Sequence, residues 1–94
     1  MSVRPIVHAV PGALAELLRG APLSPGKVEF AWKAAVGPAL QRTTSVRLEG
    51  TQLLVDAATA QWAREIGRSS HVILSRLQLL LGQETVTEIT VRKL

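Results

Sequence analysis

The spacing of apolar residues after position 23 predicts an amphipathic helix. Ser24 followed by Pro25 is a typical helix start, because serine caps free N–H groups and proline at the first helical position has no N–H that needs a partner. Pro38 cannot donate to residue 34, so we expect the helix to kink or restart at Gly37 before it continues to about Arg42. The apolar stripe of this helix comprises Val28, Ala31, Trp32, Ala35 and Ala39.

A shorter helical pattern precedes this helix. Its leucines are spaced i, i+3 and i+4 between Pro11 and Gly20, which predicts a short helix over residues 13–19. We therefore expect a lead-in segment over residues 1–23 and a single domain over residues 24–94.

The apolar period then becomes two residues, which is typical of β-strands. Residues 45–49 alternate between apolar and polar, and residues 52–57 place Leu53 and Val55 on one face. Gly50 lies between the two segments, where a tight hairpin turn requires a positive φ. The pattern predicts a two-stranded antiparallel ribbon.

Helical periodicity returns over residues 60–81, and Gly82 is placed to end this helix. Gly67 either lies within one long helix or divides the segment into two. Residues 85–92 are rich in β-branched side chains and predict a third strand. The apolar side of the long helical segment comprises Trp62, Ala63, Ile66, Ile73, Leu77 and Leu80.

The order of these elements predicts the fold class. A strand, a long crossover and a further strand imply a right-handed βαβ unit, which makes the sheet mixed. We therefore predict an α+β fold of two layers, with helices packed on one face of a three-stranded mixed sheet. The expected order is α-α-β-β-α-β, in which the third α position, between the hairpin and the last strand, holds one helix or a pair.

Composition supports a folded domain and limits its chemistry. Hydrophobic residues make up 47% and charged residues 19% of the 94 residues, which is the balance of a chain that buries one core. The chain contains no cysteine, which excludes disulfides and a thiolate nucleophile. Arg76 interrupts the most apolar run, so we expect no membrane span. Prolines and polar residues interrupt the apolar N-terminus, so we expect no secretion signal and a cytoplasmic protein.

No residue pattern predicts catalysis or cofactor binding. Residues 20–28 have the wrong spacing for a phosphate loop and place Val28 where magnesium needs a hydroxyl ligand. His8 and His71 are far apart in the sequence, which gives a metal site no ligand pair. Ser70 and His71 are adjacent on a helix and point about 100° apart, so they do not form a nucleophile and base. We expect no catalytic residues, metal, cofactor or small-molecule substrate.

The formal net charge of +4 favours polyanionic partners. On the long helical segment, a polar side that spans about 100° of arc includes Arg64, Arg68 and His71. One interpretation is contact with the phosphates of single-stranded or forked DNA, and the other is an ordinary solvated helix face. If the helix ends and a sheet edge converge, the candidate nucleic-acid-binding residues are Arg42, Arg47, Arg64, Arg68, Arg76, Arg92 and Lys93.

Three segments around the two tryptophans resemble the bacterial DciA family. The segments are FAWKAAVGPALQRTT, VRLEGTQLLVDAATAQWAREI and LSRLQLLLGQETVTEITVRKL. The family core has a helix with W-x-x-x-V-G, a Leu–Gly–Leu-Val hairpin, a W-A-x-E-Leu/Ile helix, and a Leu-rich helix before a final strand. The matching positions are Trp32, Val36, Gly37, Leu48, Gly50, Leu53, Val55, Trp62, Ala63, Glu65, Ile66, Leu77, Leu81 and Gly82.

The resemblance implies a K-homology-like domain that binds the replicative DNA helicase and helps to load it on single-stranded DNA, without ATPase activity of its own. Under this interpretation Trp32 and Trp62 are core anchors, or one of them shows an edge that docks a helicase helix. Two other functions stay open, an RNA-binding K-homology-like module and a small protein-interaction domain. No two glycines have the spacing of the G-x-x-G loop that clamps nucleotides, which counts against the RNA-binding module.

Overall fold

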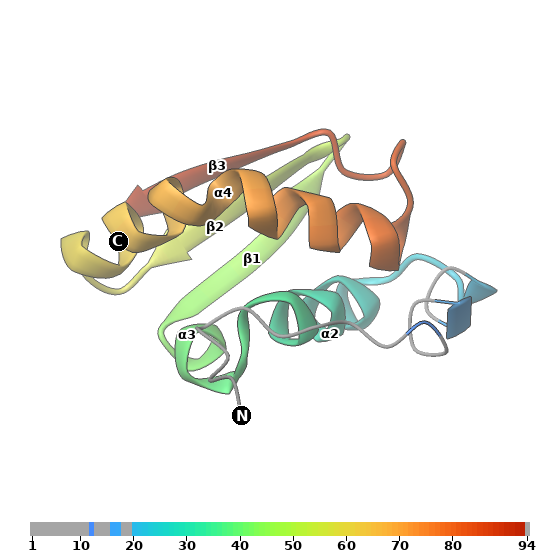
Figure 1. The fold of residues 1–94 in the computed structure, drawn as a ribbon, viewed down its shortest axis with the longest axis horizontal. Helices are drawn as coiled ribbons and strands as arrows, with labels where there is room; N and C mark the ends of the chain where they lie inside the picture. Colours follow the sequence, from blue (N-terminus) through green and yellow to red (C-terminus); the bar gives the residue numbers. More distant parts are fainter. Residues whose placement is uncertain (1–11, 13–15, 18–19, 94) are drawn as a thin grey trace, which may run out of the picture.

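The computed structural model describes residue 12, residues 16–17 and residues 20–93. Its elements in chain order are α2 (Pro25–Val36), α3 (Pro38–Arg42), β1 (Thr44–Glu49), β2 (Gln52–Ala57), α4 (Ala60–Leu81) and β3 (Glu88–Lys93). In Figure 1, α4 lies in front of the strands and α2 lies beside it. The predicted α+β class and element order are confirmed. The short helix expected over residues 13–19 lies largely outside the described residues.

Side-chain caps begin the two longest helices among the described residues. The Ser24 hydroxyl accepts a hydrogen bond from the Lys27 backbone N–H, and the Thr59 hydroxyl accepts one from the Trp62 backbone N–H, each at 3.1 Å. α4 continues unbroken through Gly67 for 22 residues. The long crossover is therefore one helix rather than a pair.

The restart between α2 and α3 occurs where the sequence predicts it. Gly37 adopts a φ of 90° after α2, and Pro38 begins α3. The restart changes which residues face the core, so Leu40 is buried while Ala39 is exposed. Placing Ala39 on the buried stripe was therefore wrong, because that expectation extended one unbroken helical period across the restart.

The sheet has the strand order β1-β2-β3 and is mixed, as predicted. β1 and β2 are antiparallel, with Glu49 opposite Gln52 on either side of the turn. Within that turn Gly50 alone has a positive φ, 60°, which is the pattern of a type II′ hairpin. β3 is parallel to β2, with Leu53 opposite Ile89, and α4 forms the crossover between the two strands.

The last strand begins at Glu88 rather than at Thr85, where the sequence pattern placed its start. The Thr85 N–H donates to the Gly82 carbonyl at 3.2 Å, and the Gln78 side chain donates to the Val86 carbonyl at 2.9 Å. Val86 is 0% exposed. These contacts hold the segment as a turn against the end of α4, and strand pairing starts only after it.

The core lies between the helices and one face of the sheet. Leu53, Val55 and Ala57 alternate along β2 and are 0% exposed, whereas the residues between them are only partly buried. No polar or charged residue is buried among those that the structure describes. The residues that alternate with these core residues lie on the opposite face of the sheet, which is open to solvent.

Trp32 is the largest buried side chain in this core, with 1% of its surface exposed. Its indole Nε1 donates to the Thr44 hydroxyl at 2.8 Å, and that hydroxyl donates in turn to the Leu40 carbonyl at 2.9 Å. These two hydrogen bonds connect α2, α3 and the first residue of β1. The indole N–H is thereby satisfied inside the core.

Replacing Thr44 with valine keeps the approximate shape of the side chain but removes the acceptor for the indole N–H. We expect Thr44→Val to lower the free energy of unfolding by about 1–3 kcal/mol, because the Trp32 donor is then buried without a partner. Urea denaturation measures this change, and Trp32→Phe supplies a background without the donor. An equal loss in both backgrounds would show that the hydrogen bond does not stabilise the fold.

Candidate functional site

Several candidate cations lie at one end of the molecule. The Ala58 N–H donates to the Thr43 carbonyl at 2.9 Å, which places the end of α3 beside the start of α4. Lys93 is opposite Ala57 in the sheet, so the end of β3 reaches the same region (Figure 1). We call this region the basic end, and its cations are Arg42, Arg64, Arg68 and Lys93.

Arg64 and Arg68 contribute the helical part of the basic end, and both are exposed near the start of α4. Arg64 forms no ion pair with any described residue. Arg68 Nη2 lies 3.2 Å from Glu65 Oε1, while 75% of the Arg68 side chain remains exposed. An ion pair this exposed is weak. The Arg68 guanidinium therefore stays accessible to a phosphate.

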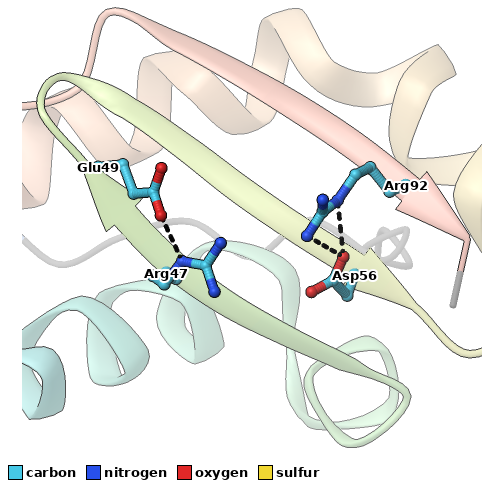
Figure 2. A network of polar contacts seen from close by, with 4 residues as sticks. All are labelled: Arg47, Glu49, Asp56 and Arg92. Atoms are coloured by element: carbon cyan, nitrogen blue, oxygen red, sulfur yellow. Dashed lines mark hydrogen bonds and ion pairs between the residues drawn. The ribbon is translucent and has the colours of Figure 1, made fainter.

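Arg47 and Arg92 lie instead on the open face of the sheet, where each is paired with a carboxylate (Figure 2). Arg47 Nε is 2.9 Å from Glu49 Oε2. Arg92 Nε and Nη2 are each 3.0 Å from Asp56 Oδ1. Glu88 shares this face by its place in the register, so carboxylates outnumber cations there. The open face is therefore a poor surface for phosphate.

Arg76 is separated from both groups of cations. It lies eight residues beyond Arg68 on α4, about 12 Å along the helix axis at 1.5 Å per residue. It is half-buried. The structure thus brings together only part of the candidate set, because strand alternation and helix length separate the rest.

The two tryptophans occupy different environments. Trp32 is 1% exposed and shows no edge to a partner, so it is a core anchor in this structure. Trp62 is half-buried in the first turn of α4, where it packs partly against the core beside the basic end. Of the two, Trp62 is the one placed to contact a partner.

An apolar cavity of about 300 Å³ between the start of α2 and β1 was not identified from the sequence. The alternation of Val46 and Leu48 is visible in the sequence. Nothing local shows, however, that β1 is an edge strand or that α2 flanks it. The cavity is lined by Leu23, Ser24, Pro25, Val28, Val46, Arg47 and Leu48.

The described residues contain no group of three or more His, Cys, Asp or Glu side chains arranged to hold a metal ion. In the same part of the chain, no helix is both long enough and apolar enough to cross a membrane.

The fold and the basic end describe a small α+β domain with an exposed cationic region beside a half-buried tryptophan. A family model described as Dna[CI] antecedent, DciA matches residues 6–91 of the 94-residue chain, so the protein belongs to the DciA family, a family of helicase loaders. This match confirms the resemblance around the two tryptophans. A search of curated proteins finds no match.

The two ion pairs of the open face differ in exposure, which predicts different contributions to stability. Asp56 has 21% of its side chain exposed and accepts from two nitrogens of Arg92, whereas Glu49 is 57% exposed and meets one nitrogen of Arg47. We expect Asp56→Asn to lower the free energy of unfolding by about 1 kcal/mol and Glu49→Gln by about 0.3 kcal/mol. Urea denaturation at low and high salt measures both changes in the free energy of unfolding. Equal losses for the two variants would contradict the inference that the Asp56–Arg92 pair is the stronger one.

Proposed function

We propose that this protein binds the replicative DNA helicase and helps to load it on single-stranded DNA in the cytoplasm. The observation that carries the proposal is the family match over residues 6–91. We infer that the protein acts without hydrolysing ATP itself, because its sequence contains no phosphate loop.

A loader that hydrolyses no ATP must work through differential affinity. A ligand shifts an equilibrium between two states only by the difference in its affinity for them. The protein would therefore bind the loading-competent state of the helicase more tightly than the closed state. Its effect should then saturate as its concentration rises.

We assign DNA contact to the basic end. Its arginines can donate two parallel hydrogen bonds to a phosphate, and the exposed pair on α4 is the least neutralised of the candidate arginine pairs. Binding of this kind is independent of sequence and sensitive to salt. The RNA-binding alternative gains no support, because no two glycines in the sequence have the G-x-x-G spacing that clamps nucleotides.

Two double variants with the same loss of charge test this assignment. We expect Arg64→Gln with Arg68→Gln to weaken binding to a labelled single-stranded oligonucleotide and to flatten its dependence on salt. Each lost phosphate contact removes about 0.7 from the log–log slope on single strands. Fluorescence anisotropy over a salt series gives both quantities.

The matched control is Arg47→Gln with Arg92→Gln, which removes two cations from the open face. We expect this control to retain most of the salt slope. Equal effects of the two double variants would mean that DNA senses only net charge, and the assignment to the basic end would be wrong.

We assign helicase contact to the surface around Trp62. Interface energy concentrates in large aromatic side chains that are partly buried before binding and become fully desolvated in the complex. Trp62 meets this description, and it lies two residues before Arg64 in α4, so the helicase and DNA would contact the same end of that helix.

We expect micromolar binding to the cognate helicase and faster unwinding of a forked substrate, with no ATP hydrolysis by this protein alone. Trp62→Leu should weaken helicase binding about tenfold, whereas Phe30→Leu, on the exposed side of α2, should not. Calorimetry and an unwinding assay measure these effects. No complex with the wild type, together with no stimulation, would remove the loader proposal.

A further inference from the structure

The backbone of β1 has an unpaired edge. β1 is an outer strand of the sheet, and the bond from the Ala58 N–H to the Thr43 carbonyl sets which of its residues pair with β2. Antiparallel bonding alternates, so Val46 and Leu48 direct their N–H and C=O groups away from β2. Among the described residues, no backbone group bonds to them on that side.

The same stretch of β1 forms one wall of the 300 Å³ apolar cavity. Leu23 and Val28 line the opposite wall, and Leu23 is 56% exposed. Unpaired backbone donors and acceptors thus lie beside an apolar groove. This combination is the one used when an extended peptide adds a strand to a sheet, since backbone bonds provide affinity and the groove receives alternate side chains.

A second cavity continues the groove along β1. It has a volume of about 160 Å³, shares Val46 with the first, and is lined by Glu29 and Thr44 beside the buried indole. Glu29 is exposed and forms no ion pair with any described residue. The groove therefore changes from apolar near Leu48 to acidic near Thr44.

We propose that this groove binds an extended segment of a partner protein as a fourth strand beside β1. The segment would place apolar side chains at two alternate positions opposite Leu48 and Val46. It would place a lysine or arginine two positions further on, near Glu29. Alternate residues of a strand are about 6.6–6.8 Å apart, which matches the spacing of the β1 residues that form the wall. Gln41 and Thr44 line the acidic end of the groove, which therefore adjoins Arg42 of the basic end. The proposal does not depend on helicase loading.

Synthetic peptides test the proposal on the full chain. The probe is a short peptide in which valine and threonine alternate, so that its valines face the groove. A lysine replaces the third groove-facing residue, two positions after the second valine. We expect saturable NMR shifts at the Val46 and Leu48 amides of the ¹⁵N-labelled protein, with slower hydrogen exchange at both. A control peptide with N-methylated backbone amides on its pairing edge should bind at least about tenfold more weakly, because it cannot form the strand bonds.

Matched protein variants separate the groove from general hydrophobicity. Leu23→Glu places a charge in the groove, while Leu79→Glu changes an equally exposed leucine on α4, at 56% and 55% exposure. We expect Leu23→Glu to weaken peptide binding about tenfold and Leu79→Glu to leave it unchanged. Glu29→Lys should weaken binding of the lysine peptide about threefold and strengthen binding of the same peptide with glutamate in place of lysine.

Several results would overturn the proposal. These are no saturable shift at millimolar peptide, equal binding of the N-methylated peptide, or equal effects of Leu23→Glu and Leu79→Glu. If the same amides shift when the protein's own concentration is raised, the occupant is a second copy of the chain and the partner segment is wrong. None of these outcomes bears on helicase loading, which is measured separately.

Discussion

β2 has a neighbouring strand on each side, and one of its faces is sealed by side chains that are 0% exposed. A three-stranded sheet with a single apolar face must cover that face, and α2 and α4 pack against it. The hydrogen bonds between Trp32, Thr44 and Leu40 then fix how α2 and α3 meet the start of β1. Burial of this one face therefore determines the positions of the helices and, through them, of the cations at the basic end.

Elements with a local chemical signal were predictable from the sequence. Ser24 with Pro25 predicted the start of α2, Gly37 with Pro38 its restart, and Gly50 the hairpin, because each acts through contacts within a few residues. The start of β3 was missed because it depends on a tertiary contact. The Gln78 side chain, far from it in the sequence, holds the turn that delays strand pairing.

The candidate site was less predictable for the same reason. Alternation shows that Arg47 and Val46 point to opposite faces of β1. It does not show which face meets solvent or which carboxylates lie beside Arg47. Arg92 finds Asp56 through the parallel register of β2 and β3, which no local pattern encodes. A net charge of +4 is thus distributed unevenly, with carboxylates outnumbering cations on the open face of the sheet and cations gathered at the basic end.

The parallel pairing of β2 with β3 affects the order in which the domain folds. β1 and β2 are joined by a tight turn, so their pairing closes almost no loop, whereas β3 can pair only after residues 58–87 have returned along the sheet. Because closing a longer loop costs more chain entropy before any contact forms, we expect the hairpin to form early and β3 to dock late. Lys93 lies at the far end of β3. The basic end is therefore complete only when β3 has paired with β2.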